Sequence, residues 1–276
     1  MRIARFSVDD EPRYGVVETD DPEGLTGTVS VLDSDPLYRP VQFTGEKLQL
    51  ADVRLLAPVI PRSKVVGVGR NYAAHAAELG NEVPKTPMTF FKPNTSVIGP
   101  GESIIYPAAS NKVSFEGELA VVIGRICKEV PIDRVPEVIF GYTIANDVTA
   151  RDLQKTDGQW ARAKGSDTFC PLGPWITTHQ GLDEVAALRI RSSLDGELRQ
   201  DGNTRDMILG VAELIAFISS YTTLLPGDVI LTGTPEGVGE IQPGQEISIE
   251  IEGIGTLTNP VTGSGPSTRD SEKAEQ

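Results

Sequence analysis

The pattern of apolar and polar positions predicts many short β-strands and few helices. Ile247, Ile249 and Ile251 alternate with polar residues, which is the period of a half-buried strand. Continuous apolar runs predict buried strands at residues 64–68, 115–123, 141–148 and 228–231. A hairpin is predicted where residues 188–193 and 197–200 flank the turn dipeptide Asp195-Gly196.

Two segments have helical character. The alanine-rich segment 71–79 stops at Gly80 and predicts a short helix. Apolar residues three and four apart predict one longer amphipathic helix, closed by Pro226-Gly227: Ile208, Val211, Leu214, Ile215 and Ile218. We therefore expect a fold that is mainly β with some α.

The distribution of these elements predicts two domains and a tail. Residues 1–56 alternate short apolar runs (2–7, 14–18 and 47–56) with turn residues, and segment 57–62 carries two prolines. We predict a small N-terminal β-rich domain at 1–60 and a larger domain at 61–261. Residues 262–276 lack an apolar anchor, so we expect a flexible tail.

Composition and charge exclude several classes of protein. The chain has 276 residues and a net charge of −14, from 25 basic and 39 acidic residues, which repels the phosphates of nucleic acids. Its 28 glycines and 20 prolines argue against a helical bundle. No apolar stretch reaches the roughly 18 residues of a membrane helix, no signal peptide is evident, and Cys127 and Cys170 are too few for a disulfide framework. We expect a cytoplasmic protein.

Three carboxylates form the first candidate site. On one strand, Glu116 and Glu118 would share a face, and Asp147 stands at the end of the next apolar run. An exposed strand face and a helix cap are the alternative interpretations for these residues. Together, three carboxylates without a histidine or cysteine ligand would suit Mg²⁺ or Mn²⁺ better than Zn²⁺.

A histidine and two loops add further candidates. Segment 67–78 fails as a dinucleotide-binding fingerprint at Tyr72, but His75 and Glu78 stand three residues apart on the predicted helix, where a carboxylate can orient a general base. Lys164, in a glycine-containing loop, can offset the carboxylates, and the segment around Thr234 offers hydroxyls and backbone to an anion. Ordinary surface positions are the alternative for each of them.

In combination these segments resemble the fumarylacetoacetate hydrolase family. The resemblance spans roughly residues 60–261 and rests on six motifs in the family's order: Gly69-Arg70-Asn71-Tyr72 with His75 and Glu78; Phe91-Lys92-Pro93; Phe115-Glu116-Gly117-Glu118-Leu119; segment 146–154; Arg162-Ala163-Lys164-Gly165; and Thr232-Gly233-Thr234-Pro235. Each motif is weak alone, but six in order are highly specific.

The resemblance implies a mixed β-sandwich roll that forms a homodimer. It implies Mg²⁺ or Mn²⁺ held by Glu116, Glu118 and Asp147, with His75 and Glu78 on a lid. It also places four residues around the substrate: Lys164 as a catalytic group, and Arg70, Gln154 and Thr234 as binding groups.

Two positions differ from the pattern of the long eukaryotic-type hydrolase and indicate which branch of the family this chain resembles. Val68 stands seven residues before the histidine, where that branch has a fourth acidic ligand, and the partner acid is the nearby Glu78. Both place the chain near the smaller acylpyruvase, oxaloacetate decarboxylase and dienedioate isomerase branch.

The resemblance to this branch implies a metal-dependent enzyme of carboxylate or aromatic-ring catabolism. Its substrate would be a small 2-oxo or 2-hydroxy-dienoic dicarboxylate that reacts through a metal-chelated enolate. C–C hydrolysis or decarboxylation ranks first and 2-hydroxyhepta-2,4-diene-1,7-dioate isomerisation second. A ligand-binding relative without turnover is the non-enzyme alternative.

Overall fold

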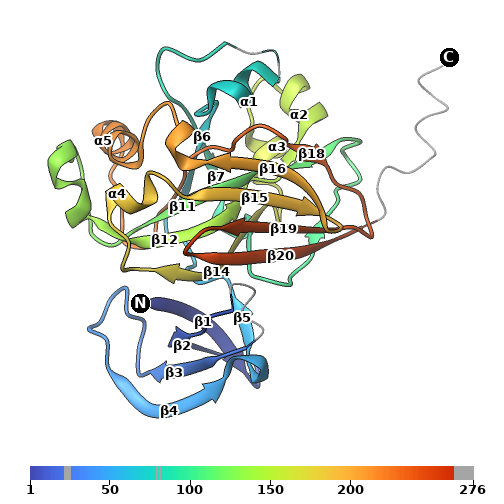
Figure 1. The fold of residues 1–276 in the computed structure, drawn as a ribbon. Helices are drawn as coiled ribbons and strands as arrows, with labels where there is room; N and C mark the ends of the chain where they lie inside the picture. The colour runs from blue at the N-terminus through green and yellow to red at the C-terminus, as the bar shows by residue number, and fades with distance from the viewer. Residues whose placement is uncertain (22–25, 79, 81, 264–276) are drawn as a thin grey trace.

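A computed structural model describes residues 1–21, 26–78, 80 and 82–263 of the chain (Figure 1). Short strands in several sheets dominate it, as predicted, and the small helices lie in the connections between them. The described helices are α1 (Ala73–Glu78), α2 (Arg151–Thr156), α3 (Ala161–Gly165), α4 (Leu182–Val185) and α5 (Val211–Tyr221), with 3₁₀ turns η1 (Leu50–Asp52), η2 (Asn94–Ser96), η3 (Ile132–Glu137) and η4 (Thr204–Asp206). The part of the predicted flexible tail from residue 264 onward lies outside the described residues.

One large sheet of twelve strands joins the N-terminal strands to strands from later parts of the described chain. Its order is β4-β3-β2-β1-β14-β12-β11-β17-β6-β7, with β5 beside β1 and β8 beside β14. The strands are β1 (Arg2–Val8), β2 (Glu11–Glu18), β3 (Thr28–Leu32), β4 (Phe43–Gln49), β5 (Arg54–Leu56), β6 (Val65–Gly69), β7 (Met88–Lys92), β8 (Val97–Ile98), β11 (Gly117–Ile123), β12 (Ile139–Asn146), β14 (Cys170–Thr177) and β17 (Val229–Leu231).

The N-terminal strands form one end of this sheet and carry their own core. Strand β1 pairs with β14 through Ile3 and Ile176, and Phe6, Val29 and Trp175 are buried together. Figure 1 shows strands β1 to β5 in blue, grouped apart from the rest of the chain. The predicted boundary at residue 60 falls in the connection between β5 and β6.

Strand prediction was weakest in this N-terminal region. Strand β3 was missed, and the run predicted at 47–56 is divided between the end of β4, η1 and β5. Strand β4 is a solvent-exposed edge strand with almost no buried side chain, so it lacks the alternation that identifies a strand in sequence.

Two smaller sheets complete the fold. Five strands pair in the order β16-β15-β19-β20-β9: β9 (Ile104–Ile105), β15 (Arg189–Leu194), β16 (Glu197–Asn203), β19 (Glu246–Ile251) and β20 (Gly255–Thr262). Three pair in the order β13-β10-β18: β10 (Val113–Phe115), β13 (Thr149–Ala150) and β18 (Gly239–Glu240). The predicted hairpin is confirmed as β15–β16, with Asp195 (φ 51°) and Gly196 (φ 80°) in the left-handed conformation that such a turn requires.

The main core lies between the large and the five-stranded sheets. Along β11, Leu119 and Val121 enter the same buried cluster as Ile249 of β19, whereas Ala120 and Val122 belong to a second cluster on the opposite face. This alternation makes β11 a central strand that is buried on both faces.

Helix α5 also contributes to the main core, through Leu214, Ile215 and Ile218. The helix begins at Val211, after Gly210, whose backbone N–H donates to Glu213 Oε2 (2.6 Å). The prediction that Ile208 belongs to this helix was wrong, since Ile208 precedes it. Pro226-Gly227 does not end the helix either, because the last helical residue is Tyr221.

Two of the candidate carboxylates, Glu116 and Asp147, follow strand ends directly, and the third, Glu118, lies near the start of β11. Residues 115–123 were predicted as one strand, but β10 ends at Phe115 and β11 begins at Gly117, so Glu116 lies at the junction of two sheets. A side chain at Gly117 would approach Ser192 Oγ to 2.6 Å, so this junction requires glycine. Likewise β12 ends at Asn146, and Asp147 follows it.

Candidate active site

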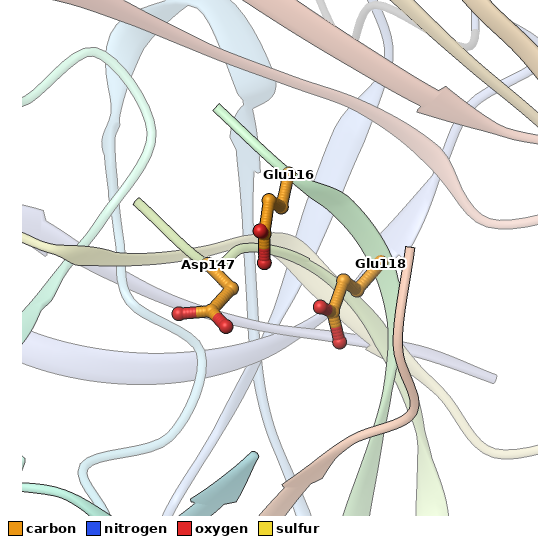
Figure 2. A group of neighbouring side chains, drawn as sticks. All are labelled: Glu116, Glu118 and Asp147. Atoms are coloured by element: carbon orange, nitrogen blue, oxygen red, sulfur yellow. The ribbon is translucent and has the colours of Figure 1, made fainter. Parts of the chain in front are cut away.

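Three buried carboxylates converge at these strand ends (Figure 2). One oxygen each from Glu116, Glu118 and Asp147 lies within 4.8 Å of the other two, and the residues are 4%, 1% and 1% exposed. Their burial excludes the alternative of an exposed strand face for Glu116 and Glu118, and Asp147 does not cap the following helix, because the N-cap of α2 is Ala150. The backbone holds the group together: Asn146 Oδ1 accepts from the Glu116 N–H (3.0 Å), and the Glu116 carbonyl accepts from the Asp147 N–H (2.9 Å).

Three cations surround two of the carboxylates. Lys164 Nζ donates to Glu116 Oε2 (2.8 Å) and to Asp147 Oδ2 (2.6 Å). Arg151 donates to Glu116 Oε1 (2.6 Å), and Lys92 donates to Asp147 Oδ1. Each oxygen of these two carboxylates therefore has a cationic partner.

Glu118 is different because no cation pairs with it among the described residues. Its Oε2 accepts only the backbone N–H of Gly233 (2.6 Å). Burial and the neighbouring charges of Asp147 and Glu116 raise the pKa of Glu118 well above its usual value. Although burial acts in the same direction on Glu116, the charges of Lys164 and Arg151 lower the pKa of that carboxyl.

This arrangement fits a hard divalent cation. All three groups offer carboxylate oxygen, and the part of the chain that the structure describes brings no histidine or cysteine into the cluster. Glu118 is the one carboxyl of the three without a cationic partner among the described residues, and a bound cation would supply that partner.

Lys164 extends from helix α3 into the site and is 3% exposed. Burial alone would lower the pKa of Lys164, but Asp147 and Glu116 raise it, so the group is an ammonium ion near neutral pH. Its Nζ also lies 5.0 Å from the centroid of the Phe90 ring, which packs edge-on against Trp160.

His75 and Glu78 lie together on α1, as predicted. His75 is 5% exposed, and its Nδ1 lies 3.3 Å from Glu78 Oε2. The Glu78 carboxylate also accepts from the backbone N–H of Gly237, at 3.0 and 3.2 Å from its two oxygens. Glu78 therefore links α1 to the loop that follows β17.

One cavity of about 1050 Å³ connects these groups. Its lining includes Glu116, Glu118, His75 and Lys164, and the residues predicted to bind substrate: Arg70, Gln154 and Thr234. Arg70 is held at φ 58°, a strained conformation for a side chain of this size, and makes no hydrogen bond within the described chain.

The other two predicted binding residues are already engaged. Gln154 accepts from Arg151 (3.2 Å), while the Thr234 hydroxyl donates to the Gly117 carbonyl (2.9 Å) and accepts from Gln200 (2.8 Å). Thr234 therefore braces the strand that carries Glu118 as well as lining the cavity.

Sequence reasoning assigned no role to Lys92, Arg151, Asn146 or Gln200. A signal existed for Lys92, which is an ionisable residue ending the apolar strand β7 and is 1% exposed. Arg151 shares the motif of Asp147, but no periodicity indicates that its side chain reaches Glu116. No helix within the described ranges is long and apolar enough to cross a membrane.

Comparisons with known families and proteins agree with this geometry. Residues 64–262 match the family described as Fumarylacetoacetate (FAA) hydrolase C-terminal, and residues 1–58 match the one described as Rv2993c-like, N-terminal. Protein Rv2993c of Mycobacterium tuberculosis is 50% identical over 265 residues, 96% of this chain and 99% of that protein. The mitochondrial oxaloacetate tautomerase Fahd2a of Rattus norvegicus is 42% identical over 219 residues, 76% of this chain and 70% of that protein.

The solved structures that resemble this chain include proteins named for two kinds of activity, an isomerase and a hydrolase. The 2-hydroxyhepta-2,4-diene-1,7-dioate isomerase from Mycobacterium marinum has a TM-score of 0.86 at 48% identity, covering 96% of this chain and 99% of that one. The fumarylpyruvate hydrolase from Pseudomonas aeruginosa, in complex with Mn²⁺ and pyruvate, has a TM-score of 0.70 at 33% identity, covering 74% and 91%. With most of its length matched by one family and half of its residues shared with a full-length relative, this chain belongs to the fumarylacetoacetate hydrolase family.

Proposed function

We propose that this chain is a divalent-metal-dependent enzyme that acts on a small 2-oxo dicarboxylate, by C–C hydrolysis or decarboxylation. The observation that carries the proposal is the convergence of three buried carboxylates, two of which, Glu116 and Glu118, line a cavity whose wall also includes His75. A structural ion-pair cluster has no need of a cavity this large or of a buried histidine on its wall.

Glu116, Glu118 and Asp147 would hold Mg²⁺ or Mn²⁺. When bound, this cation would orient the 2-oxo acid group of the substrate and stabilise the negative charge that develops on its oxygen during bond cleavage. The Mn²⁺ and pyruvate named for the hydrolase from Pseudomonas aeruginosa support this choice of metal and of substrate end.

The chain's own residues supply proton transfer and binding. His75, oriented through Nδ1 by Glu78, would remove a proton from the attacking water in hydrolysis. The Lys164 ammonium would stabilise negative charge on the reacting acid, and Arg70 has free donors for a substrate carboxylate. Helix α1, tied to the Gly237 loop by Glu78, would exclude bulk water as a lid.

Isomerisation is the second candidate, because the neighbours named as an isomerase and a tautomerase match the chain over most of its length. In that reaction His75 would move a proton between carbon and oxygen and no water would attack. A ligand-binding role without turnover is the third outcome that an assay must distinguish.

Two further features are part of the proposal. We expect a homodimer, as the family resemblance implies. Cys127 and Cys170 are both free and buried, which fits a reducing compartment such as the cytoplasm.

A substrate panel tests the proposed function. Oxaloacetate, acylpyruvates, fumarylpyruvate and 2-hydroxyhepta-2,4-diene-1,7-dioate would each be followed by absorbance with Mg²⁺ or Mn²⁺. We expect turnover of at least one compound, lost with a chelator and restored by the metal. Turnover that persists in the chelator would contradict the metal assignment, and tight binding of a 2-oxo acid without turnover would support the ligand-binding alternative.

A further inference from the structure

The cavity is lined by more basic side chains than those that pair with the carboxylate cluster, which Glu116, Glu118 and Asp147 form. Five basic side chains other than His75 line it: Arg70, Lys112, Arg151, Lys155 and Lys164. Lys164 and Arg151 pair with the carboxylate cluster, and Lys112 pairs with Glu240 (2.9 Å) on the rim. Within the described chain, Arg70 and Lys155 are the lining cations without a carboxylate partner.

Lys155 stands at the mouth of the cavity. Arg151, Gln154 and Lys155 occupy positions i, i+3 and i+4 of α2, so one helix face carries all three toward the same space. Lys155 lies about 6 Å further along the helix axis than Arg151, from the rise of 1.5 Å per residue. Arg151 reaches the floor at Glu116, whereas Lys155 is exposed to solvent.

The nearest acidic residue on the same helix does not neutralise Lys155. Asp152 also lines the cavity, but its carboxylate accepts from Ser110 Oγ (2.6 Å), from the backbone N–H of Asn111 (2.7 Å) and from the Leu153 N–H (2.9 Å). The Lys155 ammonium is therefore available to an anion that enters the cavity.

The wall between floor and mouth is partly apolar. Val68, Trp160 and Val238 line the cavity together with the charged residues. A linear substrate held at the carboxylates would therefore meet both apolar surface and the Lys155 ammonium within the same cavity. The rise of about 6 Å along α2 from Arg151, which contacts Glu116, to Lys155 favours a chain longer than four carbons.

We propose that Lys155 selects linear 2-oxo dicarboxylates longer than four carbons, by pairing with the carboxylate remote from the 2-oxo acid group. This rests on the proposed function, which places the 2-oxo acid end at Glu116, Glu118 and Asp147. The residue is a specificity determinant and takes no part in bond cleavage, so its effect should fall on substrate binding.

A matched pair of non-cleaved ligands tests the inference. 2-Oxoadipate and 2-oxohexanoate share a six-carbon backbone and differ in the terminal carboxylate. Isothermal titration of the full Mn²⁺-loaded chain should show that the wild type prefers 2-oxoadipate by about fivefold, as expected for one solvent-exposed ion pair. Lys155→Met should abolish most of this preference, Lys155→Arg should retain it, and added salt should weaken it in the wild type.

The controls separate Lys155 from the general charge of the cavity. Lys112→Met removes the same charge from the same cavity, but from a lysine that Glu240 already neutralises, so the preference should remain. An equal loss in Lys112→Met, or an unchanged preference in Lys155→Met, would overturn the inference while leaving the proposed function intact. Failure of the wild type to bind either 2-oxo acid would overturn both.

Discussion

Among substitutions at the site, removal of the Lys164 charge should have the strongest effect on the electrostatic stability of the carboxylate cluster. Lys164 Nζ bridges Glu116 and Asp147 at 2.8 and 2.6 Å, and its side chain is 3% exposed. Lys164→Met keeps most of the length of the unbranched side chain and deletes the ammonium. Glu116 and Asp147 would then share the site with Glu118 while only Arg151 and Lys92 remain to offset them.

The size of the effect follows from burial. Breaking a buried ion pair by removing one partner costs about 3–5 kcal/mol. Because both carboxylates of Lys164 keep one other cation, we expect about 3 kcal/mol at pH 7. At 2–4 °C per kcal/mol for a chain of this size, the metal-free variant should unfold roughly 6–12 °C below the wild type.

Thermal unfolding of the metal-free proteins measures this directly. Lys112→Met is the matched control, because its pair with Glu240 is about half exposed and should be worth less than about 1 kcal/mol. Adding Asp147→Asn to Lys164→Met should restore part of the stability, since it deletes one of three carboxylates that only Arg151 and Lys92 would then offset. Mn²⁺ should raise the unfolding temperature of Lys164→Met more than that of the wild type. A metal-free Lys164→Met protein as stable as the wild type would refute this electrostatic description of the site.

Three further predictions concern the base, the pH dependence and the assembly. His75→Ala should lower acylpyruvate cleavage by about 10²- to 10⁴-fold and affect any oxaloacetate decarboxylation far less, because loss of CO₂ needs no activated water; equal losses in steady-state assays would remove His75 from water activation. The pKa of Glu118 is raised in the folded state, so above the usual carboxyl pKa the native protein binds more protons than the unfolded chain. The stability of the metal-free protein should therefore fall as the pH rises above about 4.5. Urea unfolding in a chelator should show a smaller fall for Glu118→Gln, and an unchanged slope would contradict the shift. Light scattering should give about twice the 29.6 kDa chain mass at micromolar concentration, whereas a monomer would contradict the expected dimer.

Strands could be predicted where the sequence has a clear hydrophobic pattern, and were missed where it has none. Buried strands such as β11 and β19 have apolar runs or clear alternation, and the β15–β16 hairpin has its Asp195-Gly196 turn, so all were predicted. Strand β4 is exposed along its length and left no such pattern. The interruption of the predicted strand at Glu116 depends on pairing with β13, which is distant in sequence.

The candidate site was predictable in its acids and much less so in its cations. Glu116, Glu118 and Asp147 are prominent in sequence because charged residues follow or interrupt apolar runs. The partners of these acids come from β7, α2 and α3, and only the folded topology brings Lys92, Arg151 and Lys164 to the same point. Long-range ion pairs of this kind have no periodicity along the chain.

The central claim is that Glu116, Glu118 and Asp147 hold a divalent cation on the floor of the cavity. Anomalous scattering at the manganese edge, from crystals of the full chain soaked in Mn²⁺, tests it most directly. We expect one strong peak within coordination distance of an oxygen from each of the three carboxylates, and no such peak in Glu118→Gln crystals treated alike. A Mn²⁺ peak at another position, or no peak beside these carboxylates at saturating Mn²⁺, would contradict the assignment.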